Sequence, residues 1–192
     1  MKKPTCILSI VAFICLSFIQ AGPTTWTIDV AHSGLRFAIT SLSISEIEGT
    51  FKFREATITA PKEDFTDAAL YLVIDANTLD TDNDDRDAHL KGPDFFDTSK
   101  YPEISFRSTS FKKTGDKKYA VTGDLTMHGI TKPVTLETTA NFGIHPQSNK
   151  PVAGFRVSGT IRRTDFGISP ATPSAMLSDE VIIIANAQFS KN

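Results

Sequence analysis

The sequence predicts an all-β protein whose antiparallel strands close into a barrel or stack as a sandwich. Three observations predict this fold class: apolar and polar residues alternate along most of the chain, turn residues separate the alternating segments, and only one short segment has helical character. Strands that lack helices to cover a second face must bury one face inside a closed barrel or against another sheet. We expect roughly eight or nine strands.

Residues 1–21 are expected to form a secretory signal peptide. Two lysines precede an uncharged run at residues 7–19, and small residues follow it. This run is too short to cross a bilayer as a helix, which needs about 20 residues. We therefore expect cleavage after Ala21 and one domain at residues 22–192. That domain would lie in the periplasm of a Gram-negative bacterium or otherwise be secreted. An uncleaved N-terminal anchor is the alternative.

Composition narrows the class of function. Both cysteines lie in the expected signal peptide, so the exported domain would depend on an ordinary core rather than on disulfides. The chain has 20 basic and 22 acidic residues, and loss of the two N-terminal lysines leaves 18 basic residues. An acidic balance without a basic cluster argues against nucleic acid and against electrostatic binding to anionic membranes. Transient membrane contact and homodimer formation stay open.

The first half of the chain contains alternating segments with one change of phase. Residues 25–29 and 35–40 are predicted strands, and apolar residues alternate again at residues 47–53. The apolar phase then slips to Ala56, which predicts a bulge or bend. Residues 70–74 form a further strand that is apolar on both faces.

The second half is more regular. Alternating segments lie at residues 104–106, 119–127, 134–144, 153–161 and 181–189. Turn sequences separate most of them, at residues 114–116, 128–129 and 145–151. Residues 83–91 alone have helical character, with acidic residues at the start and Gly92-Pro93 as a stop. The apolar stripes mix phenylalanine with glycine and alanine, which fits an elongated cavity or a well-packed core equally.

A series of motifs runs in order along the chain. They are Asp29-x-x-His32-Ser33 followed by Phe37, Gly49-Thr50-Phe51, Arg86-Asp87-Ala88-His89-Leu90, Phe95-Phe96-Asp97, Tyr101-Pro102 with Phe106 and Ser108, Gly123-Asp124-Leu125-Thr126-x-x-Gly129-x-Thr131-Lys132-Pro133-Val134, and Arg163-Thr164-Asp165-Phe166-Gly167. With these motifs the chain resembles the YceI-like family of exported lipid-binding proteins from Thr25 to Phe189. The resemblance implies an extended, eight-stranded, lipocalin-like antiparallel barrel with a short helix in one long connection. It also implies a ligand in the lumen such as a polyisoprenoid, an isoprenoid quinone or a fatty-acid derivative. This chain has Ser41-Leu42 where the family often has His-Leu, which puts the contact with the ligand's polar end in doubt.

The leading hypothesis is therefore a non-catalytic carrier or buffer of a long apolar lipid, with no cofactor. The expected apolar lining consists of Phe37, Phe51, Phe53, Leu72, Phe106, Leu125, Phe142, Phe155 and Val157. The expected polar contacts at the mouth are His32, Arg86 and His89. Arg86 would donate paired hydrogen bonds to phosphate or carbonyl oxygens of a head group.

Two other classes of function stay open. One is a solid-core exported β-domain that acts as a stress-associated interaction module. The other is a secreted enzyme that uses Arg86, Asp87 and His89. The same residues also fit a structural cluster that fixes a long connection onto one end of a barrel. Arg163 and Asp165, two residues apart at a strand end, are expected to lie on one face of the strand and to pair with other charges around the rim.

Metal and hydrolase sites are disfavoured by spacing. Asp80, Asp82 and Asp84 alternate as in a calcium loop, but Asp85 and Lys91 occupy the positions that need glycine and glutamate. The four histidines form no HxxxH or HxH pair that would bind zinc. Aspartate, histidine and serine occur together in the Asp29-x-x-His32-Ser33 motif, yet no G-x-S-x-G nucleophile turn accompanies them.

Overall fold

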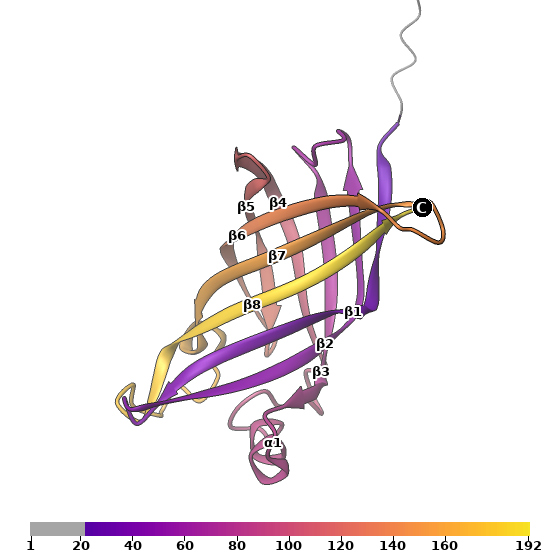
Figure 1. Ribbon diagram of the computed structural model, residues 1–192. Coiled ribbons are helices and arrows are strands. Elements are labelled where there is room, and N and C mark those ends of the chain that lie inside the picture. The colour runs from indigo at the N-terminus through magenta and orange to yellow at the C-terminus, as the bar shows by residue number, and fades with distance from the viewer. Residues whose placement is uncertain (1–21) are drawn as a thin grey trace, which may run out of the picture.

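A computed structural model describes residues 22–192, and the expected signal peptide with both cysteines lies outside them. Eight strands form one closed antiparallel barrel in which each strand pairs with its sequence neighbours and β8 closes onto β1 (Figure 1). The strands are β1 (Thr24–Ser41), β2 (Ser45–Ala60), β3 (Ala69–Asp80), β4 (Glu103–Gly115), β5 (Lys118–Met127), β6 (Ile130–Ile144), β7 (Pro151–Arg162) and β8 (Leu177–Lys191). The predicted eight-stranded barrel with one short α-helix is confirmed.

The strand count is eight because two predicted strands are one. Residues 25–29 and 35–40 both belong to β1, whose pairing with β8 breaks between Asp29 and Gly34. The pairing of β1 with β2 is interrupted over the same stretch. The phase slip at Ala56 is a second irregularity, since the β2–β3 register shifts between Phe53 and Glu55. Bulges of this kind bend a strand and help a sheet to close.

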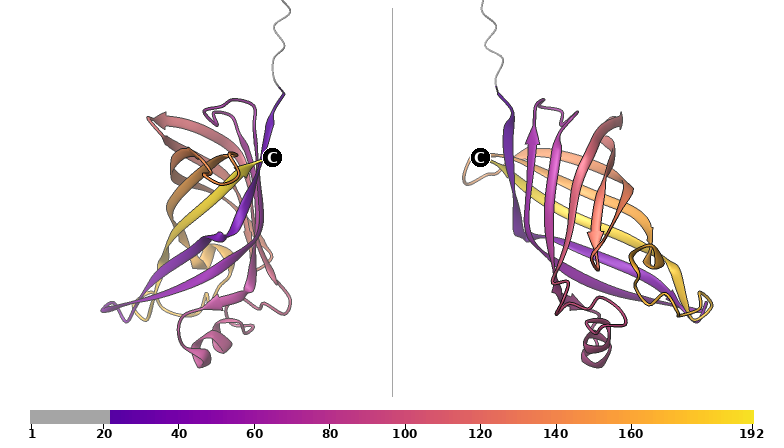
Figure 2. Two further views of the ribbon diagram at one scale, coloured as in Figure 1. Left: turned by 45° about the vertical axis from the view of Figure 1, so that its right-hand side comes forward. Right: turned by 180° about the vertical axis from the view of Figure 1, so that it is seen from behind.

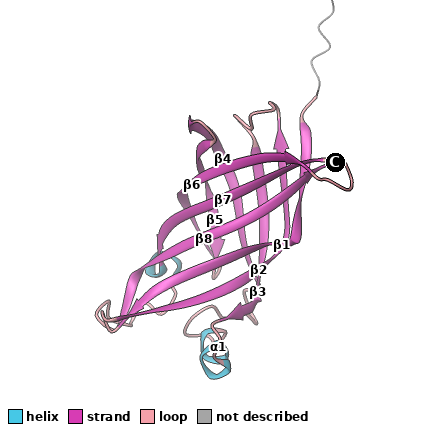
Figure 3. Cartoon of the chain, in the orientation of Figure 1, coloured by secondary structure: helices cyan, strands magenta, loops and turns pink. Residues whose placement is uncertain are grey.

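The two ends of the barrel differ in what covers them. Odd-numbered strands all run toward one end, where the connections are residues 42–44, 81–102, 128–129 and 163–176. We call this the helical end, because both helices lie there (Figure 3). The opposite end holds the connections 61–68, 116–117 and 145–150 together with both ends of the described chain, and we call it the terminal end (Figure 2).

The short helix forms where the sequence predicts it. Helix α1 spans Asp84–Leu90, and the side chain of Asn83 caps it by accepting a hydrogen bond from the backbone N–H of Arg86 at 2.9 Å. Three acidic residues occupy its first turn, where the helix dipole favours them.

A second, 3₁₀ helix begins directly after β7. Helix η1 spans Arg163–Phe166 and ends at Gly167, whose φ of +67° is the left-handed conformation that glycine adopts readily. The expectation that Arg163 and Asp165 share one strand face is therefore wrong. Within the described residues, no helix is long and apolar enough to span a bilayer.

Aromatic side chains fill the terminal end. Phe65, in the β2–β3 connection, is 1% exposed, and its ring centroid lies 5.0 Å from that of Trp26, 5.3 Å from Phe155 and 5.5 Å from Phe142. The hydroxyl of Tyr119 donates to the carbonyl of Asp64 at 2.6 Å and ties this connection to β5. Burial raises the pKa of Tyr119, which keeps the hydroxyl a hydrogen-bond donor. Phe65 therefore acts as a plug.

Candidate functional site

An elongated apolar cavity runs through the barrel. It contains about 210 Å³ of space that the centre of a water molecule can occupy, more than the roughly 150 Å³ of an engineered cavity that binds benzene. All eight strands contribute to the lining, and 33 of its 36 residues are apolar. Along β8 the lining extends from Leu177 to Phe189, which is about 40 Å of strand at roughly 3.3 Å per residue. A space this long and narrow suits a chain better than a compact molecule.

Inward glycines explain why the lumen is hollow. A Cβ atom at Gly49 would lie 2.4 Å from the ring of Phe37, and one at Gly159 would lie 2.5 Å from the end of Leu136. The large side chains on neighbouring strands therefore lie flat over the glycines and cover the wall, instead of projecting across the lumen. Phe37 and Leu136 remain only half-buried although both line the cavity. The mixture of large and small residues has produced a cavity rather than a packed core.

The mouth of the cavity lies at the helical end. Leu90, Phe95 and Phe96 from the β3–β4 connection line it, together with Ile168 from the β7–β8 connection. The ring of Phe96 packs against that of Phe51 with centroids 5.4 Å apart, which joins this connection to the barrel wall. Because Phe65 plugs the terminal end, the helical end is where the cavity is open.

Arg86 is a basic side chain at this mouth with unused hydrogen-bonding capacity. Its Nε donates to Thr81 Oγ1 at 2.8 Å and its Nη2 donates to the carbonyl of Thr81 at 2.6 Å. The carboxylate of Asp87 accepts from the same threonine, from its N–H at 2.9 Å and its hydroxyl at 2.5 Å. Among residues 22–192, no group accepts a hydrogen bond from Nη1 of Arg86. The Arg86 side chain is part of the cavity lining. The side chain is thus fixed and can still bind an oxygen atom of a ligand.

Arg163 also lines the mouth but is fully engaged. It is 3% exposed, and its guanidinium donates to five backbone carbonyls. The acceptors are Ile168, Ser169, Thr172, Leu177 and Ser178. This residue organises the β7–β8 connection and does not pair with a rim carboxylate in the described chain.

The third polar lining residue lies deep in the cavity. Thr138, on β6 opposite Tyr119, is 5% exposed. Its hydroxyl is the one buried side-chain polar atom that lacks a hydrogen-bond partner among residues 22–192. A buried polar group without a partner is costly, so a ligand atom or a water molecule that accepts its proton would stabilise the site.

The structure brings most of the predicted lining together. Eight of the nine predicted apolar residues line the cavity, and Phe142 does not. Phe142 is 46% exposed and stacks on the outer side of Phe65, beyond the plug. A separate groove there has a volume of about 430 Å³, but Lys62, Glu63 and Lys191 on its walls make it a charged surface groove.

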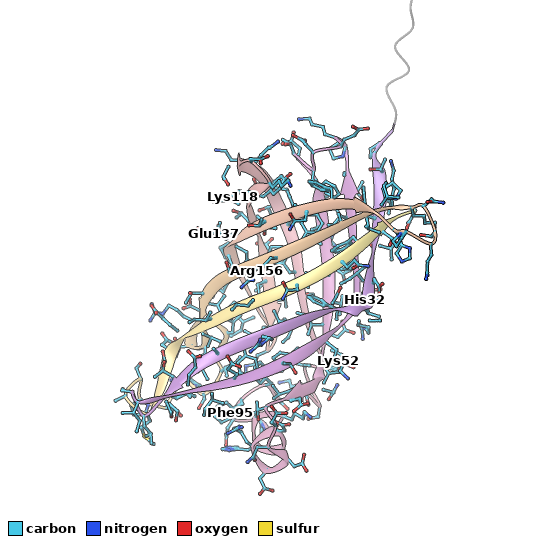
Figure 4. The ribbon with its side chains drawn as sticks, viewed as in Figure 1. His32, Lys52, Phe95, Lys118, Glu137 and Arg156 are labelled. Carbon is cyan, nitrogen blue, oxygen red and sulfur yellow. The ribbon has the colours of Figure 1, made fainter. Side chains whose placement is uncertain are left out.

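Only one of the three predicted polar residues lines the cavity. Arg86 does so, whereas His89 is exposed and packs edge-on against Phe95 with centroids 5.0 Å apart. His32 lies on β1, away from the mouth region that contains Phe95 (Figure 4). Ser41, where relatives often carry histidine, lies at the end of β1 and is not part of the lining. The charged side chains Lys52, Lys118, Glu137 and Arg156 project outward from the wall (Figure 4).

The Asp29-x-x-His32-Ser33 motif holds the β1 bulge. Asp29 contacts Nδ1 of His32 at 2.8 Å, and this hydrogen bond lowers the pKa of the Asp29 carboxyl. Ser33 Oγ donates to the carbonyl of Asp29 at 2.6 Å and accepts from the N–H of Gln188 at 2.9 Å. The serine hydroxyl is therefore bonded to backbone and not to the histidine, so the three residues are not arranged as a catalytic triad. Among residues 22–192, no three His, Cys, Asp or Glu residues gather as a metal site would require.

Sequence analysis missed several mouth residues. Phe95, Phe96 and Ile168 lie in irregular connections and Leu90 ends helix α1, so strand alternation carries no information about them. One signal could have indicated them, because two adjacent phenylalanines inside a polar turn are costly unless they cover an apolar surface.

Comparisons with known proteins agree with this geometry. The model of the YceI-like domain matches residues 26–189. Protein YceI of Escherichia coli O6:H1 is 39% identical over 158 residues, which cover 82% of this chain and 81% of that protein.

Two solved structures share the fold. Burkholderia cenocepacia BcnA superposes with a TM-score of 0.72 at 25% identity, over 84% of this chain and 98% of that one. A polyisoprenoid-binding domain from Saccharophagus degradans, implicated in plant cell wall breakdown, has a TM-score of 0.60 over 87% of this chain and 98% of that one. At 16% identity, this second likeness concerns the fold alone. The chain therefore belongs to the YceI-like family, as the matched domain model, the 39% sequence identity with protein YceI and the barrel architecture together show.

Proposed function

We propose that the protein binds a long apolar lipid in its lumen and carries or sequesters it without chemical turnover. The observation that carries this proposal is the elongated apolar cavity, which is closed at one end by Phe65 and open at the other. Polyisoprenoids, isoprenoid quinones and fatty-acid derivatives all have the required shape. The description of a structural neighbour as a polyisoprenoid-binding domain supports the first of these classes.

The energetics favour a long tail. Each CH₂ group removed from water contributes about 0.8 kcal/mol, so a tail of about 15 groups contributes roughly 12 kcal/mol. Association costs on the order of 4–15 kcal/mol in lost freedom and ordering, so short tails bind weakly and long tails bind well. Arg86 at the mouth adds orientation, because its free Nη1 donates to an oxygen of the polar end. Phosphate, carboxylate and carbonyl oxygens are all suitable acceptors.

The direct test is extraction of the purified protein with organic solvent, followed by mass spectrometry. We expect close to one long-chain lipid per protein molecule. Delipidated protein should then bind added isoprenoid or fatty acyl ligands. An empty extract, together with failure to bind added ligands of all three classes, would exclude the proposal.

A matched pair of variants locates the ligand. Gly159→Phe places a ring inside the lumen, and its Cβ atom requires only the flexible end of Leu136 to move. Gly154→Phe places the same ring on the outer face, where nothing lies within 4 Å of its Cβ atom. We expect the inner variant to fold and to bind ligand at least about tenfold more weakly, and the outer variant to bind normally. Circular dichroism checks the fold and titration with a fluorescent fatty acid measures binding. Equal affinity of the two variants would place the ligand outside the lumen.

A further inference from the structure

An exposed apolar tip projects from the helical end. It consists of Leu42 and Ile44 from the β1–β2 turn and Met176 from the β7–β8 connection, which are 58%, 85% and 56% exposed. The backbone N–H of Leu42 donates to the carbonyl of Met176 at 2.9 Å, so the two connections are joined. They lie side by side at the corner of the barrel farthest from the termini (Figures 1 and 2).

The backbone of Leu42 is unfavourable for leucine. Leu42 has a φ of +51° and Ser43 has a φ of +59°, a left-handed conformation that glycine or asparagine adopts at lower cost. The leucine side chain also gains little burial within the folded chain. Neither backbone conformation nor core packing therefore accounts for a large apolar residue at this position, which points to a role outside the folded domain.

The two segments that build the tip contain no charged side chain. Residues 37–45 and 166–178 include no acidic or basic residue and no histidine, although 22% of the chain is charged. Desolvating a charge is costly, so a surface that enters an apolar medium must exclude charged side chains. Both segments that build the tip satisfy this condition.

The tip is continuous with the cavity. Ile39 pairs with Ile47 and with Val181, and Ser41 pairs with Leu177, directly beside the tip residues. Ile39, Ile47, Leu177 and Val181 all line the cavity. Apolar side chains thus extend from the exposed tip into the lumen along both connections.

We propose that the tip inserts into the surface of a lipid bilayer, so that a lipid moves between bilayer and lumen without crossing water. This inference rests on the proposed function of the cavity. A second copy of the chain is a poorer occupant, since three side chains fall well short of the roughly 800 Å² per partner that a standard interface buries. Loops that insert a few apolar side chains bind membranes weakly and reversibly, as a carrier requires.

The test compares two variants of the chain that begins at Gly22, which contains every strand of the closed barrel. Leu42→Asn combined with Ile44→Ser removes two of the three tip side chains, and this is the tip variant. Ile144→Ser is a control that removes an isoleucine, 61% exposed, at the terminal end. Flotation with phosphatidylcholine vesicles measures binding. We expect the tip variant to bind about tenfold more weakly, because two partly inserted side chains are lost. The control should bind as the wild type does, and Asn at position 42 should leave thermal stability unchanged or higher.

A second readout separates this inference from the proposed function. The tip variant should keep the affinity for a soluble fluorescent fatty acid but should take up lipid from vesicles about tenfold more slowly. Wild-type protein that does not float with vesicles, or a control that weakens binding as much as the tip variant, would overturn the inference. So would light scattering that shows a wild-type dimer and a monomeric tip variant. If vesicle binding follows the tip but no lipid enters the lumen, the proposed function alone fails.

Discussion

Asp179 fixes the start of the β7–β8 connection through hydrogen bonds to its carboxylate. Asp179 accepts hydrogen bonds from Thr164 Oγ1 at 2.7 Å and from the Thr164 N–H at 3.1 Å, and Arg162 Nε donates to it at 2.7 Å. Burial raises the pKa of this carboxyl, but the hydrogen bonds from Thr164 and Arg162 outweigh that effect and lower the pKa to about 2. The side chain is only 14% exposed, so solvent screens these interactions little.

This lowered pKa predicts a pH-dependent stability. The folded pKa of about 2 lies below the ordinary aspartate pKa of 3.8, so Asp179 stabilises the protein above pH ~4 and loses that contribution as the pH falls through 2. We expect Asp179→Asn to cost about 2 kcal/mol at pH 6. The difference between the two proteins should shrink as the pH falls below 4 and approach zero only below pH ~2. Urea unfolding at several pH values measures this difference in the free energy of unfolding. A difference that does not change with pH would contradict the lowered pKa of Asp179.

At the scale of elements, irregular connections were the hardest part of the molecule to predict. Alternation located most strand segments and predicted the β2 irregularity, because each strand has one face toward the lumen. It could not show that residues 25–29 and 35–40 belong to one strand, because the bulge between them is held by a hydrogen bond from Ser33 to Asp29 and another from Gln188 to Ser33. Helix η1 was missed for a similar reason, since it depends on hydrogen bonds from Arg163 to carbonyls farther along the same connection.

The β7–β8 connection should depend on Arg163. Lysine has three N–H donors in place of five, so Arg163→Lys leaves buried carbonyls without partners at about 1–3 kcal/mol each. We expect a loss of roughly 2–5 kcal/mol and faster hydrogen exchange at residues 168–178. Arg162→Lys, at a side chain that is 64% exposed, is the matched control and should cost less than about 1 kcal/mol. Similar losses for the two variants would show that Arg163 does not organise the connection.

The whole molecule is solid at one end and hollow at the other. Sequence alone could not show where along each strand the lumen stops, because the alternation continues past the rim. Phe142 shares a strand face with Ala140, which is fully buried, yet it lies outside the plug. Sequence also could not show that His32 and Arg86 lie apart from each other, because a motif does not reveal which part of the barrel it reaches.

The same phenylalanine-to-alanine change should lower the free energy of unfolding by different amounts at the two ends. Phe65→Ala removes a side chain that is 1% exposed and leaves a new void, so we expect a loss of about 3–5 kcal/mol. Phe37→Ala removes a half-buried ring that already faces empty space, and it should cost less than about 2 kcal/mol. Urea unfolding of delipidated protein gives both values. Equal losses would indicate that the lumen is as tightly packed as the plug.

The closure of the terminal end by Phe65 has one more consequence. Under the proposed function, a ligand enters with its hydrocarbon end first, and its oxygen-bearing group enters last and leaves first. The affinity then rises with each carbon added to the tail until the leading atoms meet Phe65. Carbons beyond that length stay in water and add nothing to the affinity. The protein would then discriminate between ligands by a minimum tail length rather than by one chemical structure.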